Sequence, residues 1–160
     1  MRRFFILAAL LLVTISSFAQ DGRSIYQKYS DTQFISAVYV SPAMFKMIGK
    51  LPDLQMKNMA VDFSPIIKSL TGLYIISSNS LNLSNRLCSD VKNLVNSGKY
   101  ELFMEAKESM ERVRIYTAGD ETTVSSFVML ASGDGSATFI CLDGNMNRSD
   151  LNYLLAELIK

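Results

Sequence analysis

Residues 112–143, RVRIYTAGDETTVSSFVMLASGDGSATFICLD, decide the fold of this chain. Apolar side chains recur at close to every second position, a spacing typical of strands that bury one face. The segments 118–121 (AGDE) and 132–135 (SGDG) interrupt this pattern and supply the glycine and aspartate residues that tight hairpins need for positive φ. With one strand before them, they predict an antiparallel meander of four strands at 100–105, 112–117, 123–130 and 137–143.

A helix is an open alternative for the first of these strands. Its apolar residues also satisfy a helical spacing, with glutamates on the opposite side. These residues are Leu102, Phe103, Ala106 and Met110 against Glu101, Glu105 and Glu108. We expect the strand, because the period of two begins at Tyr100.

The first half of the chain alternates strands with helices. Strands are expected at 33–40, which has apolar side chains on both faces, and at 73–77. Ser41-Pro42 and Ser64-Pro65 are typical of helix starts, because serine caps the helix and proline fits its first turn. The second of these helices is expected to run through Leu70 and to end at Gly72.

Two longer helices complete the pattern. One carries apolar residues spaced near 3.6 and is closed by Gly98; the other begins at 147–150. Their apolar faces are Leu83, Leu87, Val91, Leu94 and Val95, and Leu151, Leu154, Leu155, Leu158 and Ile159. The sequence therefore predicts an α+β fold in two layers, with a mostly antiparallel sheet, a C-terminal four-strand meander and helices packed on one face.

The N-terminus has the layout of a secretory signal peptide. Arg2 and Arg3 precede an apolar run at 4–15, which is too short to span about 30 Å of hydrocarbon, and Ser17-Phe18-Ala19 follows. We expect cleavage after Ala19, a single domain at 20–160, and export to the periplasm or the extracellular space. Because Gln20 stands where a lipid-attachment cysteine would be needed, no stable membrane anchor is expected after cleavage.

Composition restricts the possible chemistry. Loss of Arg2 and Arg3 with the leader leaves 14 basic and 15 acidic residues, a balance that does not favour nucleic-acid binding. The chain has no histidine, which excludes histidine-dependent serine triads and histidine-ligated metal sites. Cys88 and Cys141 are expected to be two separately buried thiols, with a single disulfide as the alternative.

Several segments together resemble a known family. Asp62-Phe63-Ser64-Pro65, Val113-Arg114-Ile115-Tyr116, Phe127-Val128-Met129-Leu130 and Phe139-Ile140-Cys141-Leu142-Asp143 are similar to the bacterial exported family called domain of unknown function 4252. The resemblance covers most of the chain after the leader. It implies a small exported protein and no established activity, cofactor or catalytic residue.

Two pairs of methionines are candidate metal ligands. Met44 and Met47, and Met56 and Met59, are each spaced three residues apart, so on a helix each pair would share a face. Thioethers are soft ligands that suit Cu(I). Packing in a core or an interface is the favoured alternative, because methionine fills irregular apolar gaps.

The charged residues offer two weaker sites. Arg112, Arg114 and Tyr116 should share one strand face and could bind a carboxylate or phosphate, although cross-strand pairs with Glu101 and Glu105 would explain the same charges. Asp134 and Asp143 could serve acid–base chemistry or calcium, but both stand where aspartate favours a turn.

These patterns favour a small exported binding or interaction protein without catalysis or a cofactor. Its partner is expected to be a protein or small ligand of the cell envelope. The alternatives are a soft-metal carrier that uses the methionine pairs and an enzyme that uses carboxylates alone.

Overall fold

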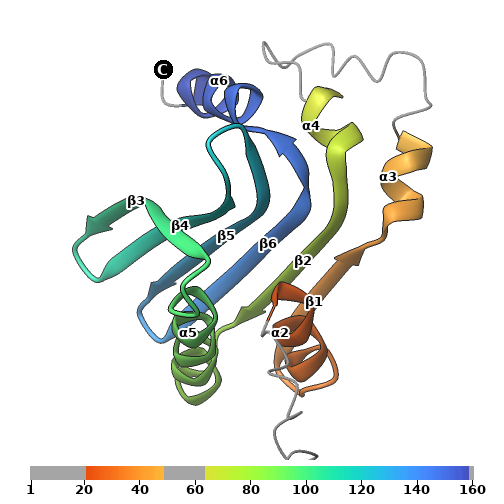
Figure 1. Ribbon diagram of the computed structural model, residues 1–160. Coiled ribbons are helices and arrows are strands. Elements are labelled where there is room, and N and C mark those ends of the chain that lie inside the picture. The colour runs from red at the N-terminus through yellow and green to blue at the C-terminus, as the bar shows by residue number, and fades with distance from the viewer. Residues whose placement is uncertain (1–20, 49–63, 159–160) are drawn as a thin grey trace, which may run out of the picture.

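A computed structural model describes residues 21–48 and 64–158 of the chain. Its six strands form one antiparallel sheet in the order β1-β2-β6-β5-β4-β3 (Figure 1). The strands are β1 Ile35–Val40, β2 Leu70–Ser78, β3 Tyr100–Glu108, β4 Glu111–Gly119, β5 Thr123–Gly133 and β6 Ser136–Asn147. The α+β class and the C-terminal meander are confirmed, and residues 100–105 are a strand rather than a helix.

The turns of the meander have the chemistry that the sequence indicated. Asp134 and Gly135, with φ of 45° and 75°, connect β5 to β6 in the left-handed conformation that a two-residue hairpin of type I′ requires. Asp120 closes the turn between β4 and β5, because its carboxylate accepts hydrogen bonds from the backbone N–H groups of Thr122 and Thr123, each at 2.8 Å.

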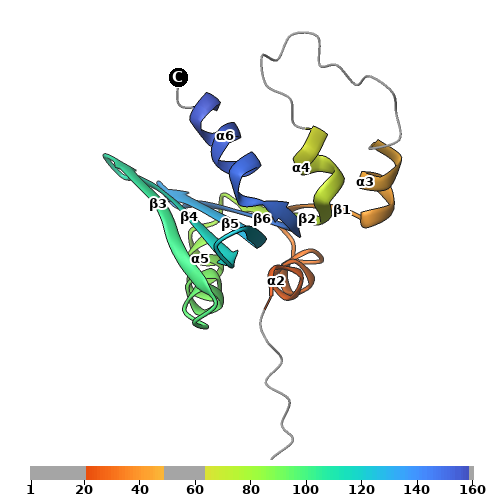
Figure 2. The same ribbon diagram turned by 45° about the horizontal axis from the view of Figure 1, so that its top comes forward.

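One face of the sheet, which we call the lower face, is covered by α2 (Gly22–Tyr29) and α5 (Leu81–Val95). Figure 2 shows both helices on the same side of the sheet. The core beneath them is closed, since Ile76, Leu87, Leu94 and Phe139 have no exposed surface. Burial on this scale is the main source of stability for a domain of this size.

Helix α2 was not predicted from the sequence. It begins at Asp21, whose side chain accepts a hydrogen bond from the Ser24 N–H while the Ser24 side chain accepts one from Asp21, a reciprocal cap. A Cβ atom at Gly22 would lie 2.2 Å from the Sγ of Cys141, so only glycine lets the first turn of α2 approach β6 this closely.

The opposite, upper face carries α3 (Pro42–Ile48), α4 (Ser64–Ser69) and α6 (Arg148–Leu158). The expectation that helices pack on one face only is therefore wrong in this detail. A second core forms here around Phe45, Ile66, Phe127 and Leu151. The strands have apolar side chains on both faces, as the pattern at 33–40 indicated. Because each apolar face is stable only when other elements bury it, helices pack on both sides of the sheet.

Several expected boundaries shift, and all four strands of the meander run further than predicted, β6 as far as Asn147. Strand β1 begins at Ile35 rather than residue 33, because Phe34 has a φ of 64° that no strand residue adopts. Helix α4 ends at Ser69, and Leu70 starts β2, where an irregularity in the pairing with β6 lies between Leu70 and Gly72. No helix in the described residues is long and apolar enough to cross a membrane.

Candidate functional site

The upper face carries an unbroken row of apolar side chains across the whole sheet. Register places one residue of each strand directly beside the next, in the order Val38, Ile75, Ile140, Met129, Ile115 and Met104. Five strand spacings of roughly 4.8 Å make this row about 24 Å long. We call these six residues the apolar row.

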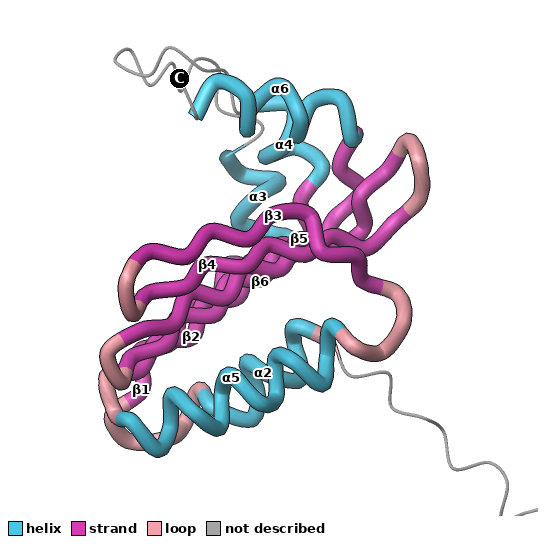
Figure 3. Tube along the Cα trace, turned by 90° about the vertical axis from the view of Figure 1, so that its left-hand side faces the viewer, coloured by secondary structure: helices cyan, strands magenta, loops and turns pink. Residues whose placement is uncertain are grey.

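The apolar row is only partly covered. Val38 at one end is 47% exposed and Met104 at the other is 36% exposed, whereas Ile115 in between is 6% exposed. Figure 3 shows α3, α4 and α6 over one end of the strands, while the end that carries the β3–β4 and β5–β6 turns has no described helix above it. The row therefore marks the border between the covered half and the open half of the upper face.

A second row runs beside the first on the open half. It consists of uncharged residues with short side chains, again one from each strand, which we call the small row: Ser36, Ser77, Thr138, Ala131, Val113 and Ala106. The hydroxyls of Ser77 and Thr138 lie 2.9 Å apart and share a hydrogen bond. Because these side chains are short, they leave the flank of the apolar row accessible.

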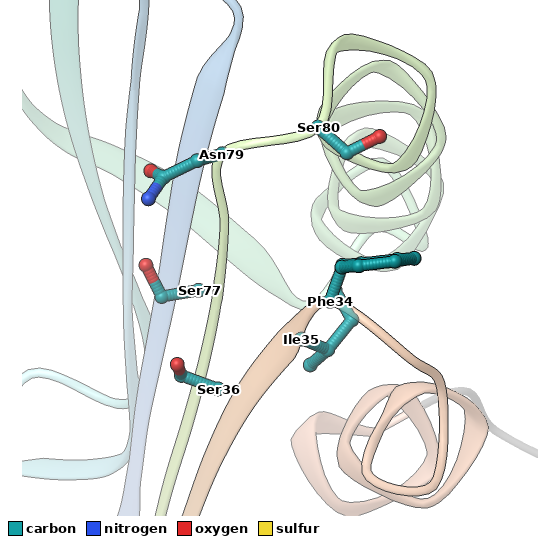
Figure 4. A pocket seen from close by; sticks show the side chains of 6 residues that line it. All are labelled: Phe34, Ile35, Ser36, Ser77, Asn79 and Ser80. Carbon is teal, nitrogen blue, oxygen red and sulfur yellow. The ribbon is translucent and has the colours of Figure 1, made fainter.

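A hollow of about 400 Å³ lies at the β1–β2 end of the small row. Figure 4 shows Ser36, Ser77 and Asn79 pointing to one side of the β1–β2 ribbon, while Phe34 lies on the side of α2 and α5. Phe34 is 84% exposed. None of the residues that line the hollow or form the two rows is charged, so this surface suits a neutral partner.

The sequence-predicted row of Arg112, Arg114 and Tyr116 lies on the lower face, near the free edge of the sheet. Arg114 donates to the carboxylate of Glu105, its directly opposed neighbour on β3, and Arg112 lies 3.7 Å from the same carboxylate. The hydrogen bond from Arg114 lowers the pKa of Glu105.

Glu101, the other acidic residue expected on this strand, faces the upper side instead. There it accepts hydrogen bonds from Arg148 at 3.2 Å and from Thr117. Binding of a ligand by Arg112, Arg114 and Tyr116 stays a prediction.

The methionines proposed for copper divide into two groups. Met44 and Met47 on α3 are 47% and 61% exposed, so they do not fill the core of the chain, and their packing in an interface stays a prediction. Phe45 between them is the residue of α3 that enters the core. Met56 and Met59 lie outside the described residues, and copper binding stays a prediction.

The two aspartates considered for catalysis or calcium lie at different levels of β6. The expectation that Asp143 stands at a turn is wrong, because β6 continues past it to Asn147. Asp134 occupies the turn before the strand and Asp143 lies nine residues further on, a separation of about 30 Å along an extended chain. They do not converge on one site. Among the residues that the structure describes, no group of three acidic, cysteine or histidine side chains is placed to hold a metal ion.

A buried polar chain that the sequence did not reveal crosses the lower face near α2. The Tyr100 hydroxyl donates to Ser126 Oγ at 3.1 Å, Ser126 Oγ lies 3.6 Å from Cys141 Sγ, and this thiol donates to Asp143 Oδ1 at 3.4 Å. Burial raises the pKa of Tyr100 to about 12 and raises the pKa of Cys141 above its ordinary value. A thiol held protonated in this way is a poor nucleophile.

Both cysteines are free thiols, so the disulfide alternative is not realised in this structure. Cys88 is half-buried on α5 against the lower core, and Cys141 is fully buried on β6. Burial also raises the pKa of Cys88.

These features define a small α+β domain with a closed lower core and a half-covered upper sheet face. The chain belongs to the family described as domain of unknown function (DUF4252), whose model matches residues 29–154. This match agrees with the resemblance seen in the sequence. No curated protein matches the chain.

Proposed function

We propose that this protein is an exported, non-catalytic binding module that holds a neutral, apolar segment of a partner protein on the open half of its upper face. The observation that carries the proposal is the apolar row, which crosses all six strands and is exposed at both ends. Partly exposed apolar area of this kind gains free energy when a partner removes it from water.

The chemistry of the surface selects the kind of partner. The apolar row and the small row carry no charge, so an anionic lipid head group or an acidic ligand would find no cation there. The hydroxyls of Ser36, Ser77 and Thr138 can instead exchange hydrogen bonds with backbone or neutral polar groups of a bound segment. An amphipathic protein segment meets both requirements.

Two further properties of the chain support a role without catalysis and outside the cytoplasm. The sequence has no histidine, and burial raises the pKa of both of its thiols, so the common nucleophiles and bases are missing or suppressed. The arrangement of Arg2, Arg3 and the apolar residues 4–15 supports export.

The test is site-specific photo-crosslinking in the native envelope. A photoreactive residue at Val38, on the open face, is compared with one at Leu81, an equally apolar residue that is 65% exposed at the start of α5. We expect crosslinks at position 38 to an apolar, uncharged peptide of one protein, and no such peptide at position 81. The same adducts at both positions, or lipid adducts at position 38, would contradict the proposal.

A further inference from the structure

Strand β3 is a free edge of the sheet with an unusual surface. It pairs only with β4, and every residue of the strand after Tyr100 is exposed. Three consecutive apolar side chains, Leu102, Phe103 and Met104, are 55%, 40% and 36% exposed. Such an edge presents unpaired backbone groups and apolar surface to another strand.

The hairpin fixes which backbone groups of β3 face outward. Ser109 and Met110 form its two-residue turn, so Glu108 and Glu111 exchange backbone hydrogen bonds with each other. Inward and outward groups then alternate along the strand. Lys107 and Glu105 therefore direct their N–H and C=O groups away from β4.

We propose that β3 pairs antiparallel with β3 of a second copy of this chain, about a two-fold axis that passes through Ala106. The two-fold axis that relates two antiparallel neighbouring strands is perpendicular to the sheet, so each side chain and its opposite neighbour lie on the same face. An axis that passed between two residues would place each of them opposite the other, although consecutive side chains point to opposite faces. The axis must therefore pass at the level of one residue. An irregularity between Leu102 and Met104 leaves residues 104–108 as the regular part of the strand.

Charge selects one register among those that symmetry allows. An axis at Glu105 or Glu108 would place a glutamate against itself, and an axis at Lys107 would place two ammonium groups together. An axis at Met104 would carry the irregular residue Phe103 into the pairing. With the axis at Ala106, Glu105 of each copy lies opposite Lys107 of the other, and these are also the residues whose backbone groups face outward.

The same register places Met104 of each copy opposite Glu108 of the other, so the regular pairing covers residues 104–108 and ends before the irregularity at Phe103. In the part of the chain that the structure describes, Lys107 forms no ion pair, so pairing supplies its partner. The result is a continuous sheet in which both upper faces point the same way. This inference rests on the edge strand and is independent of the proposed function.

Self-crosslinking tests the position of the axis. On the axis, two copies of residue 106 form a non-hydrogen-bonded pair with Cα atoms about 4.5 Å apart, which is within reach of a disulfide. In a Cys88→Ser background, Ala106→Cys should give disulfide-linked dimers under mild oxidation. Met104→Cys is the matched control, because it lies opposite Glu108 and should not crosslink to itself. Equal crosslinking by both variants, or none by either, would overturn the proposal.

Charge exchange tests the register independently. Sedimentation of the purified protein should show a concentration-dependent dimer, and Lys107→Glu should weaken it at least about ten-fold, or about 1.4 kcal/mol. Glu105→Lys should do the same, whereas a mixture of the two variants should form heterodimers, because each pair is then complementary again. A protein that stays monomeric at all concentrations, or variants that dimerise alone as well as when mixed, would contradict the pairing.

Discussion

The two faces of the sheet differ in how completely they are covered, although the strands supply apolar residues to both. Adjacent residues on β6 and on β2 show the contrast. Phe139 and Ile76 point to the lower face and have no exposed surface. Their neighbours Ile140 and Ile75 point to the upper face and are partly exposed.

The central part of the lower face is a closed core under α2 and α5, while Leu102, Arg112 and Arg114 on β3 and β4 stay partly exposed at its edge. Helices cover only half of the upper face. The covered residues stabilise the fold, whereas the uncovered apolar residues of the upper face are free to bind a partner.

The largest expected effect is a difference between two adjacent residues of β6. Phe139→Ala should lower the free energy of unfolding by about 3–5 kcal/mol, because it opens a cavity in the closed lower core. Ile140→Ala should cost less than about 2 kcal/mol, since solvent already reaches its side chain. Urea unfolding of both variants measures the difference. Equal losses would mean that the upper face is as closed as the lower one.

A smaller effect is expected where α2 meets the lower face. Gly22→Ala should cost about 1–3 kcal/mol, because the added Cβ would lie 2.2 Å from Cys141 Sγ and 2.8 Å from its Cβ. Combining it with Cys141→Ala removes the sulfur, so the double variant should be less unstable than the sum of the two single changes. Additive losses in thermal or urea unfolding would show that α2 does not rest on this sulfur.

The smallest effect concerns the pH dependence of the lower face. Asp90 on α5 accepts hydrogen bonds from Lys28 Nζ at 2.7 Å and Tyr29 OH at 2.6 Å on α2. Burial raises the pKa of Asp90, but these two bonds more than offset it, and the pKa lies below its ordinary value. The carboxylate therefore stabilises the fold above about pH 4, and this contribution is lost as the pH falls through the lowered pKa.

Asp90→Asn should accordingly cost about 1 kcal/mol at pH 7 and progressively less as the pH falls below about 4 and through the lowered pKa of Asp90, because the carboxyl group of the parent then becomes protonated as well. Asp31→Asn, at an exposed aspartate near the end of α2, is the matched control and should leave the curve unchanged. The measurement is the free energy of unfolding of the parent and of both variants from pH 3 to pH 7. A cost for Asp90→Asn that does not vary with pH would exclude the ionic contribution.

Much of the fold could be predicted from local sequence. The alternation in 112–143 and its glycine–aspartate turns gave the meander, and the spacing of Leu83, Leu87 and Val91 gave α5. Helix α2 could not be predicted in the same way, since it is short and the third position of its capping box, which begins at Asp21, is occupied by Ser24 rather than by a glutamate. The continuous apolar runs at 127–130 and 139–142 already contained the signal for cover on both faces.

The candidate site could not be predicted, because its residues come from six strands. Val38, Ile75 and Ile140 become neighbours only through the pairing of β1 with β2 and of β2 with β6. These pairings join segments distant in sequence, and no local pattern specifies their register. The residues that sequence analysis favoured were charged or sulfur-bearing, whereas the surface that the fold assembles is neutral.

Methyl NMR with a neutral apolar probe tests most directly the claim that the upper face is the binding face. Nile red is titrated into the protein labelled at its isoleucine methyl groups, and Ile75 and Ile140 on the upper face are compared with Ile76 and Ile25 in the lower core. We expect the resonances of Ile75 and Ile140 to shift saturably while those of Ile76 and Ile25 stay in place. Shifts confined to the lower-core methyls, or no saturable shift at Ile75 and Ile140, would contradict that claim.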